Sequence, residues 1–108
     1  MKPIVFLGDS LEVIRRFPEA ARREAGFQLD RVQRGLDAYD WKPMKTVGPG
    51  VRELRVRDAA GAFRVIYIAT FADAIYVLHA FQKQTQRTAK RDLDVALSRL
   101  RDLMRGRR

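Results

Sequence analysis

The sequence predicts an α+β fold, a small and mostly antiparallel sheet packed by helices in the order β-α-α-β-β-β-α. In three segments, apolar residues recur at spacings of three and four, which is the period of an amphipathic helix. Three other segments are rich in β-branched and aromatic residues and are separated by short connections, which favours an antiparallel meander. A chain of 108 residues is expected to form one domain, residues 1–108.

The first third of the chain predicts a strand followed by two helices. Residues 3–7 form a short apolar run, and Asp9 or Ser10 can cap the helix that follows it. Pro18 suits the first turn of a second helix over residues 18–36. The apolar positions of the two helices are Leu11, Ile14 and Phe17, then Ala21, Ala25, Leu29, Val32 and Leu36.

The middle of the chain predicts a loop and then a meander. Proline and glycine interrupt the pattern over residues 37–50, which are therefore expected to form a loop. The middle strand is apolar on both faces apart from Arg64, as expected for a strand that is covered on both sides. The expected strands are residues 51–58, 63–70 and 74–82.

The last segment predicts an amphipathic helix that Thr88 can cap. Its apolar face must dock on another element, and all helices are expected on one face of the sheet. The residues of this apolar face are Leu93, Ala96, Leu97, Leu100, Leu103 and Met104.

The charge of the chain indicates an anionic partner. The 22 Lys and Arg residues against 13 Asp and Glu residues give a net charge of +9. Residues 83–108 hold nine basic and three acidic residues, so two thirds of the excess lies in the last quarter. This distribution favours a nucleic acid or an acidic protein as partner over a merely solvated helix face.

Several kinds of site have no support in the sequence. There is no cysteine and only one histidine, which argues against a thiol nucleophile and a dedicated metal site. The chain has no phosphate-binding loop, dinucleotide fingerprint or zinc-protease motif. No apolar run approaches the ~20 residues of a membrane span, and the short apolar start does not resemble a signal peptide. A cytoplasmic protein is expected.

The remaining constellation is cationic and lies on the predicted sheet. An even-numbered turn, Ala60-Gly61 or Ala59 to Ala62, would place Arg57 directly opposite Arg64 and on one face with Arg55. Like charges opposite one another destabilise a hairpin, and an anionic ligand would relieve that cost. The cluster therefore predicts a phosphate site. The competing interpretation is that Arg64 pairs with Glu53 or Asp58 and the other arginines are only exposed.

Three further residue groups have a structural and a functional interpretation. Lys83 opens a polar run ending at Thr88, whose donors could continue the anion site or form an ordinary loop. His79 lies on an otherwise apolar strand and is expected to be a satisfied core residue rather than a base. Trp41 is expected to anchor its loop rather than to stack on a nucleobase.

A set of motifs adds a family likeness. The second half of the chain contains Gly50-Val-Arg-Glu-Leu-Arg-Val-Arg-Asp, Gly61-Ala-Phe-Arg-Val-Ile-Tyr and Val77-Leu-His-Ala-Phe-Gln-Lys-Gln-Thr. Upstream lie Phe17-Pro18-Glu19 and Trp41-Lys42-Pro43-Met44. In this order and spacing, the motifs resemble the phage-derived branch of the RelE/HigB-type toxins of bacterial toxin-antitoxin systems.

The resemblance implies a RelE-like, microbial ribonuclease-type fold and a ribosome-dependent endoribonuclease that cuts translated mRNA. It also implies a helix-turn-helix antitoxin as partner and a site without metal or cofactor. The catalytic positions of the family correspond to Arg57, Arg64 and Lys83. The expected RNA-binding residues are Arg52, Arg55, Lys45, Thr85 and Arg87.

The implied chemistry is attack of a ribose 2′-hydroxyl on the adjacent phosphate. The last helix has neither tyrosine nor histidine, so the general base stays unassigned. Lys83 is one candidate, because neighbouring arginines favour its neutral form. Two alternatives stay open: a ParE-like poison of DNA gyrase, and a non-catalytic relative that binds only the ribosome or an antitoxin.

Overall fold

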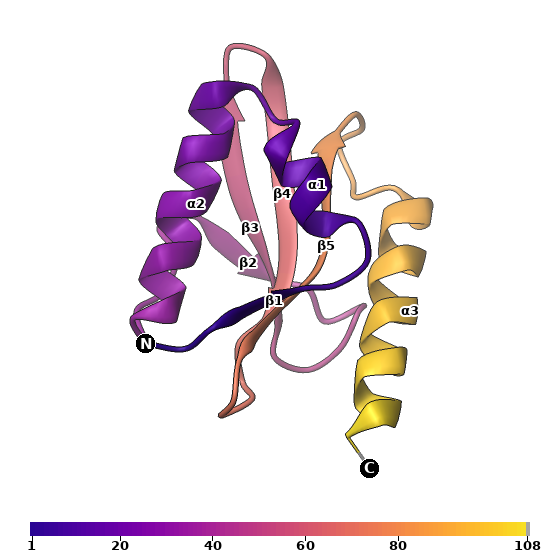
Figure 1. Cartoon of the computed structure of the whole chain (residues 1–108). Helices are drawn as coiled ribbons and strands as arrows, with labels where there is room; N and C mark the ends of the chain where they lie inside the picture. Colours follow the sequence, from indigo (N-terminus) through magenta and orange to yellow (C-terminus); the bar gives the residue numbers. More distant parts are fainter. Residues whose placement is uncertain (108) are drawn as a thin grey trace.

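A five-stranded sheet with strand order β1-β5-β4-β3-β2 organises the computed structural model, which describes residues 1–107 (Figure 1). The meander of β3, β4 and β5 is antiparallel, as predicted, and β1 joins β5 in parallel. In chain order the elements are β1 (Ile4–Phe6), α1 (Ser10–Arg15), α2 (Glu19–Gln33), β2 (Trp41–Pro43), β3 (Val51–Asp58), β4 (Gly61–Ile68), β5 (Ile75–Lys83) and α3 (Lys90–Gly106). The predicted α+β fold is confirmed, with one additional strand.

The additional strand, β2, lies in the segment that was predicted to be a loop. It pairs antiparallel with β3, with Trp41 opposite Leu54 and Pro43 opposite Arg52. Three residues are too few to show a strand's alternation, and a proline argues against a central strand. Pro43 is compatible with pairing here because β2 is the edge strand. The strand therefore depends on its partner rather than on its own sequence.

Helices cover both faces of the sheet, so the prediction that they share one face is wrong. The two N-terminal helices, α1 and α2, pack on one face, and α3 packs on the other (Figure 1). The composition of β4 explains this arrangement, because Phe63, Val65 and Tyr67 are buried on one side and Ile66 and Ile68 on the other. A strand that is apolar on both faces needs cover on both.

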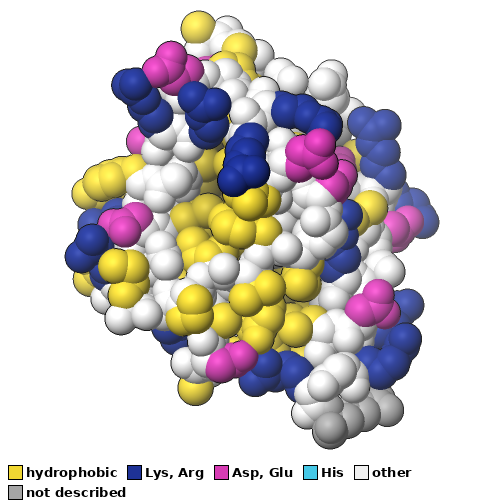
Figure 2. All heavy atoms as spheres, viewed as in Figure 1, with side chains coloured by type: hydrophobic (Ala, Val, Ile, Leu, Met, Phe, Trp, Pro, Cys, Tyr) yellow, Lys and Arg dark blue, Asp and Glu magenta, His cyan; other side chains and the backbone are white. Residues whose placement is uncertain are grey.

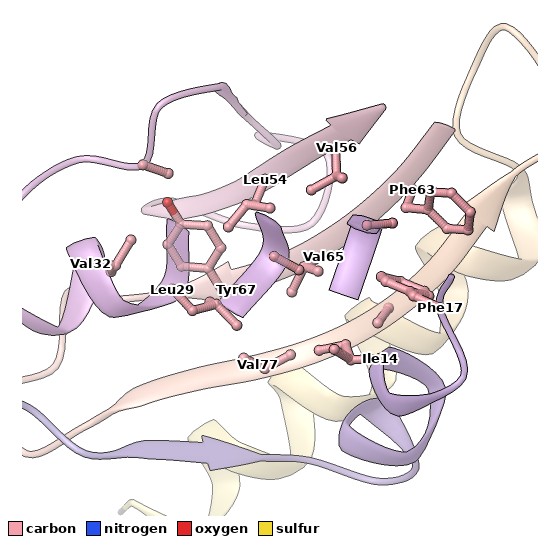
Figure 3. Close-up of a cluster of buried hydrophobic side chains, with 14 of the residues drawn as sticks. Ile14, Phe17, Leu29, Val32, Leu54, Val56, Phe63, Val65, Tyr67 and Val77 are labelled. Atoms are coloured by element: carbon pink, nitrogen blue, oxygen red, sulfur yellow. The ribbon is translucent and has the colours of Figure 1, made fainter. Parts of the chain in front are cut away.

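The core beneath α1 and α2 joins their predicted apolar positions, except Leu11 and Leu36, to the sheet (Figure 3). The rings of Phe17 and Phe63 lie 4.8 Å apart between centroids. Ala21 and Ala25 are fully buried, which lets α2 approach the strands closely. Leu36, predicted to be part of this face, is half exposed because α2 ends at Gln33 and the chain turns at Gly35, which has a left-handed φ of +83°.

The second core lies between α3 and the opposite face. The apolar stripe of α3 packs on the sheet as predicted, except that Met104 remains 49% exposed. Thr88 does not cap this helix: Ala89 is the N-cap residue and no side-chain cap is formed. Asp9 similarly holds the N-cap position of α1 without a side-chain cap, and its carboxylate binds Arg99 at 2.9 Å. Asp9 and Thr88, the side chains that were predicted to cap these helices, instead contact residues that are distant in the chain.

The surface is rich in basic side chains. Figure 2 shows Lys and Arg distributed around the face that α1 and α2 form, with apolar side chains exposed between them. Within residues 1–107, no helix is both long enough and apolar enough to cross a bilayer.

Candidate functional site

The strand pairing brings three arginines to the sheet face that α3 covers in part. Arg55 lies directly opposite Arg64, and Arg57 lies opposite Ala62. The predicted pairing of Arg57 with Arg64 is therefore wrong by two residues. A shift of two leaves every side chain on its original face, because side chains alternate with a period of two. The predicted common face of the three arginines is confirmed.

The turn between β3 and β4 explains the shift in register. Asp58 pairs with Gly61, so the turn consists of two alanines, at 59 and 60. The Asp58 carboxylate accepts a hydrogen bond from the Ala60 amide at 2.7 Å, which stabilises this tight turn. Gly61 has a φ of +138°, a conformation that favours glycine.

These arginines and Lys83 open onto one pocket of about 630 Å³, here termed the cationic pocket. Strands β3, β4 and β5 supply the four cations, and the loop after β5 closes one side. No carboxylate among residues 1–107 lines the pocket, so its electrostatic character is that of an anion site. The lining residues are Arg55, Arg57, Ala62, Arg64, Lys83, Gln84, Thr85 and Gln86.

Arg64 is the buried member of the pocket, with 2% of its surface exposed. Its Nη1 donates to the Phe63 carbonyl at 3.0 Å, and its Nε lies 3.5 Å from Glu53 Oε1. Neither Nε nor Oε1 has a hydrogen-bond partner among residues 1–107. Burial lowers the pKa of Arg64; Glu53 opposes this shift, and the charges of Arg55 and Arg57 add to it. A bound anion would favour the charged guanidinium.

Glu53 supports the cationic pocket without lining it. Its carboxylate is fully buried and does not line the pocket. Thr88 Oγ1 donates to Oε2 at 2.9 Å, and Lys42 Nζ lies 3.7 Å from Oε1. The predicted alternative that Arg64 pairs with Glu53 is therefore correct, but the pairing coexists with the pocket. Glu53 orients Arg64 and ties the loop between β5 and α3 to the sheet.

The sequence analysis considered the pairing of Glu53 with Arg64 but not the contacts of Thr88 and Lys42 with Glu53. The sequence did indicate the face on which Glu53 lies. Glu53, Arg55 and Arg57 are spaced two residues apart on β3, and side chains at that spacing point to the same face of a sheet. No local signal links Thr88 or Lys42 to Glu53, because they lie 35 and 11 residues away in the chain.

Lys83 ends β5 opposite Ala62 and is half-buried at the edge of the pocket. Burial lowers the pKa of its ammonium group, and the charge of Arg64 lowers it further. Both effects favour the neutral amine. Lys83 is thus the lining residue best suited to accept a proton.

The two remaining arginines differ in their surroundings. Arg55 Nε is buried without a hydrogen-bond partner among residues 1–107, 4.0 Å from Asp40 Oδ1. Arg57 is exposed, and no carboxylate in the described part of the chain forms a salt bridge with it. Arg57 is therefore the cation freest to contact a ligand.

Comparison with known proteins places the chain in a family. Residues 12–101 match the sequence model of the family described as Phage derived protein Gp49-like (DUF891). The chain belongs to the Gp49-like family. This membership is consistent with a toxin-type role and an antitoxin partner. No curated protein matches the chain.

The structure of this Gp49-like protein separates the expected RNA-binding residues into three places. Arg55 and Thr85 line the cationic pocket, although the Thr85 hydroxyl donates to the Arg87 carbonyl. Lys45 and Arg87 line a neighbouring hollow of about 520 Å³, which shares Gln86 with the cationic pocket. Arg52 lines neither of these two hollows, but it shares a further hollow of about 490 Å³ with Lys45.

Arg52 lies on the opposite sheet face, where it has local partners. It forms a salt bridge with Asp37 at 2.9 Å, and its guanidinium lies 3.7 Å above the Trp41 ring. Trp41 packs against the α1 and α2 core, as expected of an anchor. Arg52 holds β2 and the preceding loop to the sheet.

His79 also has a structural partner. Its Nε2 donates to Asp92 Oδ1 at 2.7 Å, and its ring stacks on Phe81 with 5.3 Å between centroids. His79 does not line the cationic pocket of this Gp49-like protein. Its Nδ1 is buried without a hydrogen-bond partner among residues 1–107, so the expectation of a satisfied core histidine is met only at Nε2. Within residues 1–107, no three His, Asp or Glu side chains gather into a possible metal site.

Proposed function

We propose that this Gp49-like protein is the toxin of a type II toxin-antitoxin system, a RelE/HigB-type endoribonuclease that cuts mRNA on the ribosome in the cytoplasm. The observation that carries the proposal is the cationic pocket, into which three strands direct four cations and no carboxylate. Clustered like charges cost stability without a ligand, and a phosphodiester supplies the missing negative charge. A helix-turn-helix antitoxin is the proposed partner.

The proposed reaction is transesterification without a metal ion. The ribose 2′-oxygen forms a bond to phosphorus, and the bond from phosphorus to the 5′-oxygen breaks. The products are a 2′,3′-cyclic phosphate and a free 5′-hydroxyl. Negative charge grows on the non-bridging oxygens in the transition state, and each preorganised donor at such a position contributes ~3 to 4 kcal/mol.

Three residues share this chemistry in the proposal. Arg57 and Arg64 bind the phosphate and stabilise the phosphorane. Lys83 in its neutral form accepts the 2′-hydroxyl proton, which its lowered pKa supports. The departing 5′-oxygen takes a proton from water, and the protonated Lys83 returns its proton to the solvent. Glu53 is not assigned as the base because it is fully buried behind Arg64. Its role is to orient the guanidinium.

Induced expression followed by mapping of mRNA 5′ ends tests the proposal. We expect cuts within translated messages for the parent protein and their loss in Arg57→Ala. Arg101→Ala is the matched control, because Arg101 is an exposed arginine of α3 remote from the pocket lining. A DNA-damage response without cuts would instead indicate a gyrase poison, and growth inhibition with neither would indicate a non-catalytic relative.

A further inference from the structure

A second hollow of about 390 Å³ adjoins the cationic pocket and differs from it in character. The two share Lys83, Gln84 and Thr85, so they lie on two sides of the chain leaving β5. We term this second site the α3 hollow. It is completed by Phe81, Gln82, Ala89, Arg91 and Asp92.

The α3 hollow combines an aromatic ring with fixed polar groups. Phe81 is held in place by the parallel ring of His79, with an interplanar angle of 18°. Asp92 is held by its 2.7 Å hydrogen bond from His79 Nε2, and its side chain is only 13% exposed. Both lining residues are thus oriented by one histidine. Arg91 adds exposed donors at the same hollow.

This combination matches a nucleobase better than a phosphate. A base offers hydrogen-bonding groups at its edge for Asp92 and Arg91. It also offers an apolar surface for the small exposed part of Phe81, which is 7% exposed and packed against His79. A phosphate would meet the carboxylate of Asp92. The cationic pocket has the reverse character, with four cations and no aromatic side chain in its lining.

We propose that the α3 hollow receives the nucleobase beside the scissile phosphate and that Asp92 is a specificity-determining residue. This proposal rests on the proposed ribonuclease function. An ionised carboxylate only accepts hydrogen bonds. Cytosine, adenine and guanine carry an exocyclic amino donor, whereas uracil has none and its single ring N–H donor lies between two carbonyl oxygens, which repel a carboxylate. The hollow therefore favours an amino-bearing base over uracil at one position flanking the cut.

Replacing Asp92 by asparagine tests the proposal. In Asp92→Asn, the side-chain carbonyl still accepts from His79 Nε2, and the amide nitrogen adds a donor to the hollow. Cut sites mapped by mRNA 5′ ends should favour an amino-bearing base over uracil by about tenfold in the parent protein, a typical effect for one hydrogen bond to a charged group. Asp92→Asn should abolish or reverse that preference.

Asp94→Asn is the matched control, because Asp94 is an exposed carboxylate of the same helix that pairs with Lys90. Its cuts should keep the parent's base preference. The absence of cuts in the parent protein would contradict the ribonuclease function itself. Cuts whose flanking bases are the same in Asp92→Asn and the parent would overturn only the α3 hollow proposal.

A second variant covers the case in which Asp92→Asn does not fold. Ala89 lines the α3 hollow but not the cationic pocket, and its φ of −63° and ψ of 147° accept any L residue. Ala89→Leu fills the hollow. Circular dichroism should show an intact fold, with cuts that become several-fold rarer and lose their flanking-base preference. Unchanged cut sites and frequency in a folded Ala89→Leu protein would refute the proposal.

Discussion

Arg57 and Arg64 occupy the same pocket but differ in what their removal changes. Arg57 is exposed and has no salt-bridge partner in the described part of the chain. Arg57→Ala should therefore lower the cleavage rate by about a hundredfold, the usual effect of losing one transition-state donor. The thermal midpoint should stay the same or rise slightly, because one of the clustered like charges is removed. Single-turnover cleavage and calorimetry measure the two effects. A large drop in midpoint would show that Arg57 has a structural role instead.

Arg64→Ala should affect both activity and stability. The buried Glu53 carboxylate would then keep only Thr88 and the more distant Lys42, and breaking a buried pair costs about 3 to 5 kcal/mol. Adding Glu53→Gln should recover part of the unfolding free energy but none of the activity. Chemical denaturation of the single and double variants measures the coupling energy between Arg64 and Glu53. If the two substitutions changed the free energy of unfolding additively, the proposed pairing would be contradicted.

Arg64→Lys retains the positive charge but removes the guanidinium group, so it separates the effect of charge from the effect of hydrogen-bond geometry. Lysine cannot form the planar two-pronged contact that guanidinium makes with phosphate. We expect stability close to that of the parent and only partial cleavage activity. Full activity in this variant would mean that Arg64 acts as a point charge alone.

At the scale of elements, the loop between β5 and α3 depends on one hydrogen bond to the sheet. Thr88 is the loop residue that donates to Glu53. Thr88→Val keeps the shape of the side chain and removes the donor, which should lower the free energy of unfolding by about 2 kcal/mol. Hydrogen exchange should show faster opening of residues 84–89. Unchanged exchange would indicate that the apolar packing of α3 holds the loop.

A separate cluster of polar and aromatic side chains stabilises the C-terminal end of α3. Arg107 binds Asp73 at 3.1 Å and lies 4.1 Å from the Phe71 ring centroid, and Tyr76 donates to Asp73 at 2.6 Å. The hydrogen bonds from Tyr76 and Arg107 lower the pKa of Asp73 from 3.8 to about 2. A carboxylate with a lowered pKa stabilises the fold above its unfolded pKa.

That stabilisation should disappear as the pH falls from about 4 toward 2, the window set by the pKa of Asp73. Asp73→Asn should therefore be less stable than the parent at pH 6, and the two proteins should converge near pH 2. Urea unfolding at a series of pH values measures the difference. A difference that is independent of pH would exclude Asp73 ionisation as its cause.

At the scale of the whole molecule, the cationic pocket and the most exposed aromatic side chains lie on different parts of the protein. The leucines of α3 pack against the core on one face of the sheet and stay partly exposed. The exposed aromatic side chains are on α2 and the segment after it, where Phe27 and Tyr39 are 50% and 62% exposed and in ring contact. An acidic antitoxin that inhibits the protein should use both the cationic pocket and apolar contacts.

Binding of the antitoxin should therefore compete with an RNA oligonucleotide at low salt and persist at high salt. Electrostatic attraction accelerates association and is screened by salt, whereas apolar burial is not weakened by it. Arg57→Ala should lower the salt dependence, and Phe27→Ser should lower affinity mainly at high salt. The candidate antitoxin is the product of the gene next to the one that encodes this protein. Its binding, measured at a low and a high salt concentration, tests the prediction. Binding without RNA displacement or loss of toxicity would contradict the toxin-antitoxin interpretation.

Local patterns were sufficient for much of this fold. The strand predicted over residues 51–58 has those bounds in the structure, and the apolar spacing of α3 predicted its packing face. The common face of Arg55, Arg57 and Arg64 was also predictable despite an incorrect register, because an error of two residues preserves the face. These features depend on periods of 2 and 3.6 residues, which a short sequence window contains.

The sequence by itself determined the α+β class, the amphipathic helices and the cationic face of the meander. Only the tertiary structure decided that helices cover both faces, that Trp41–Pro43 forms an edge strand, and that Thr88 and Lys42 meet at Glu53. Local periodicity sets the side on which a residue lies because alternation is a property of the backbone. It does not set which distant segment covers that side, because this choice depends on burying apolar surface and pairing polar groups across the whole chain.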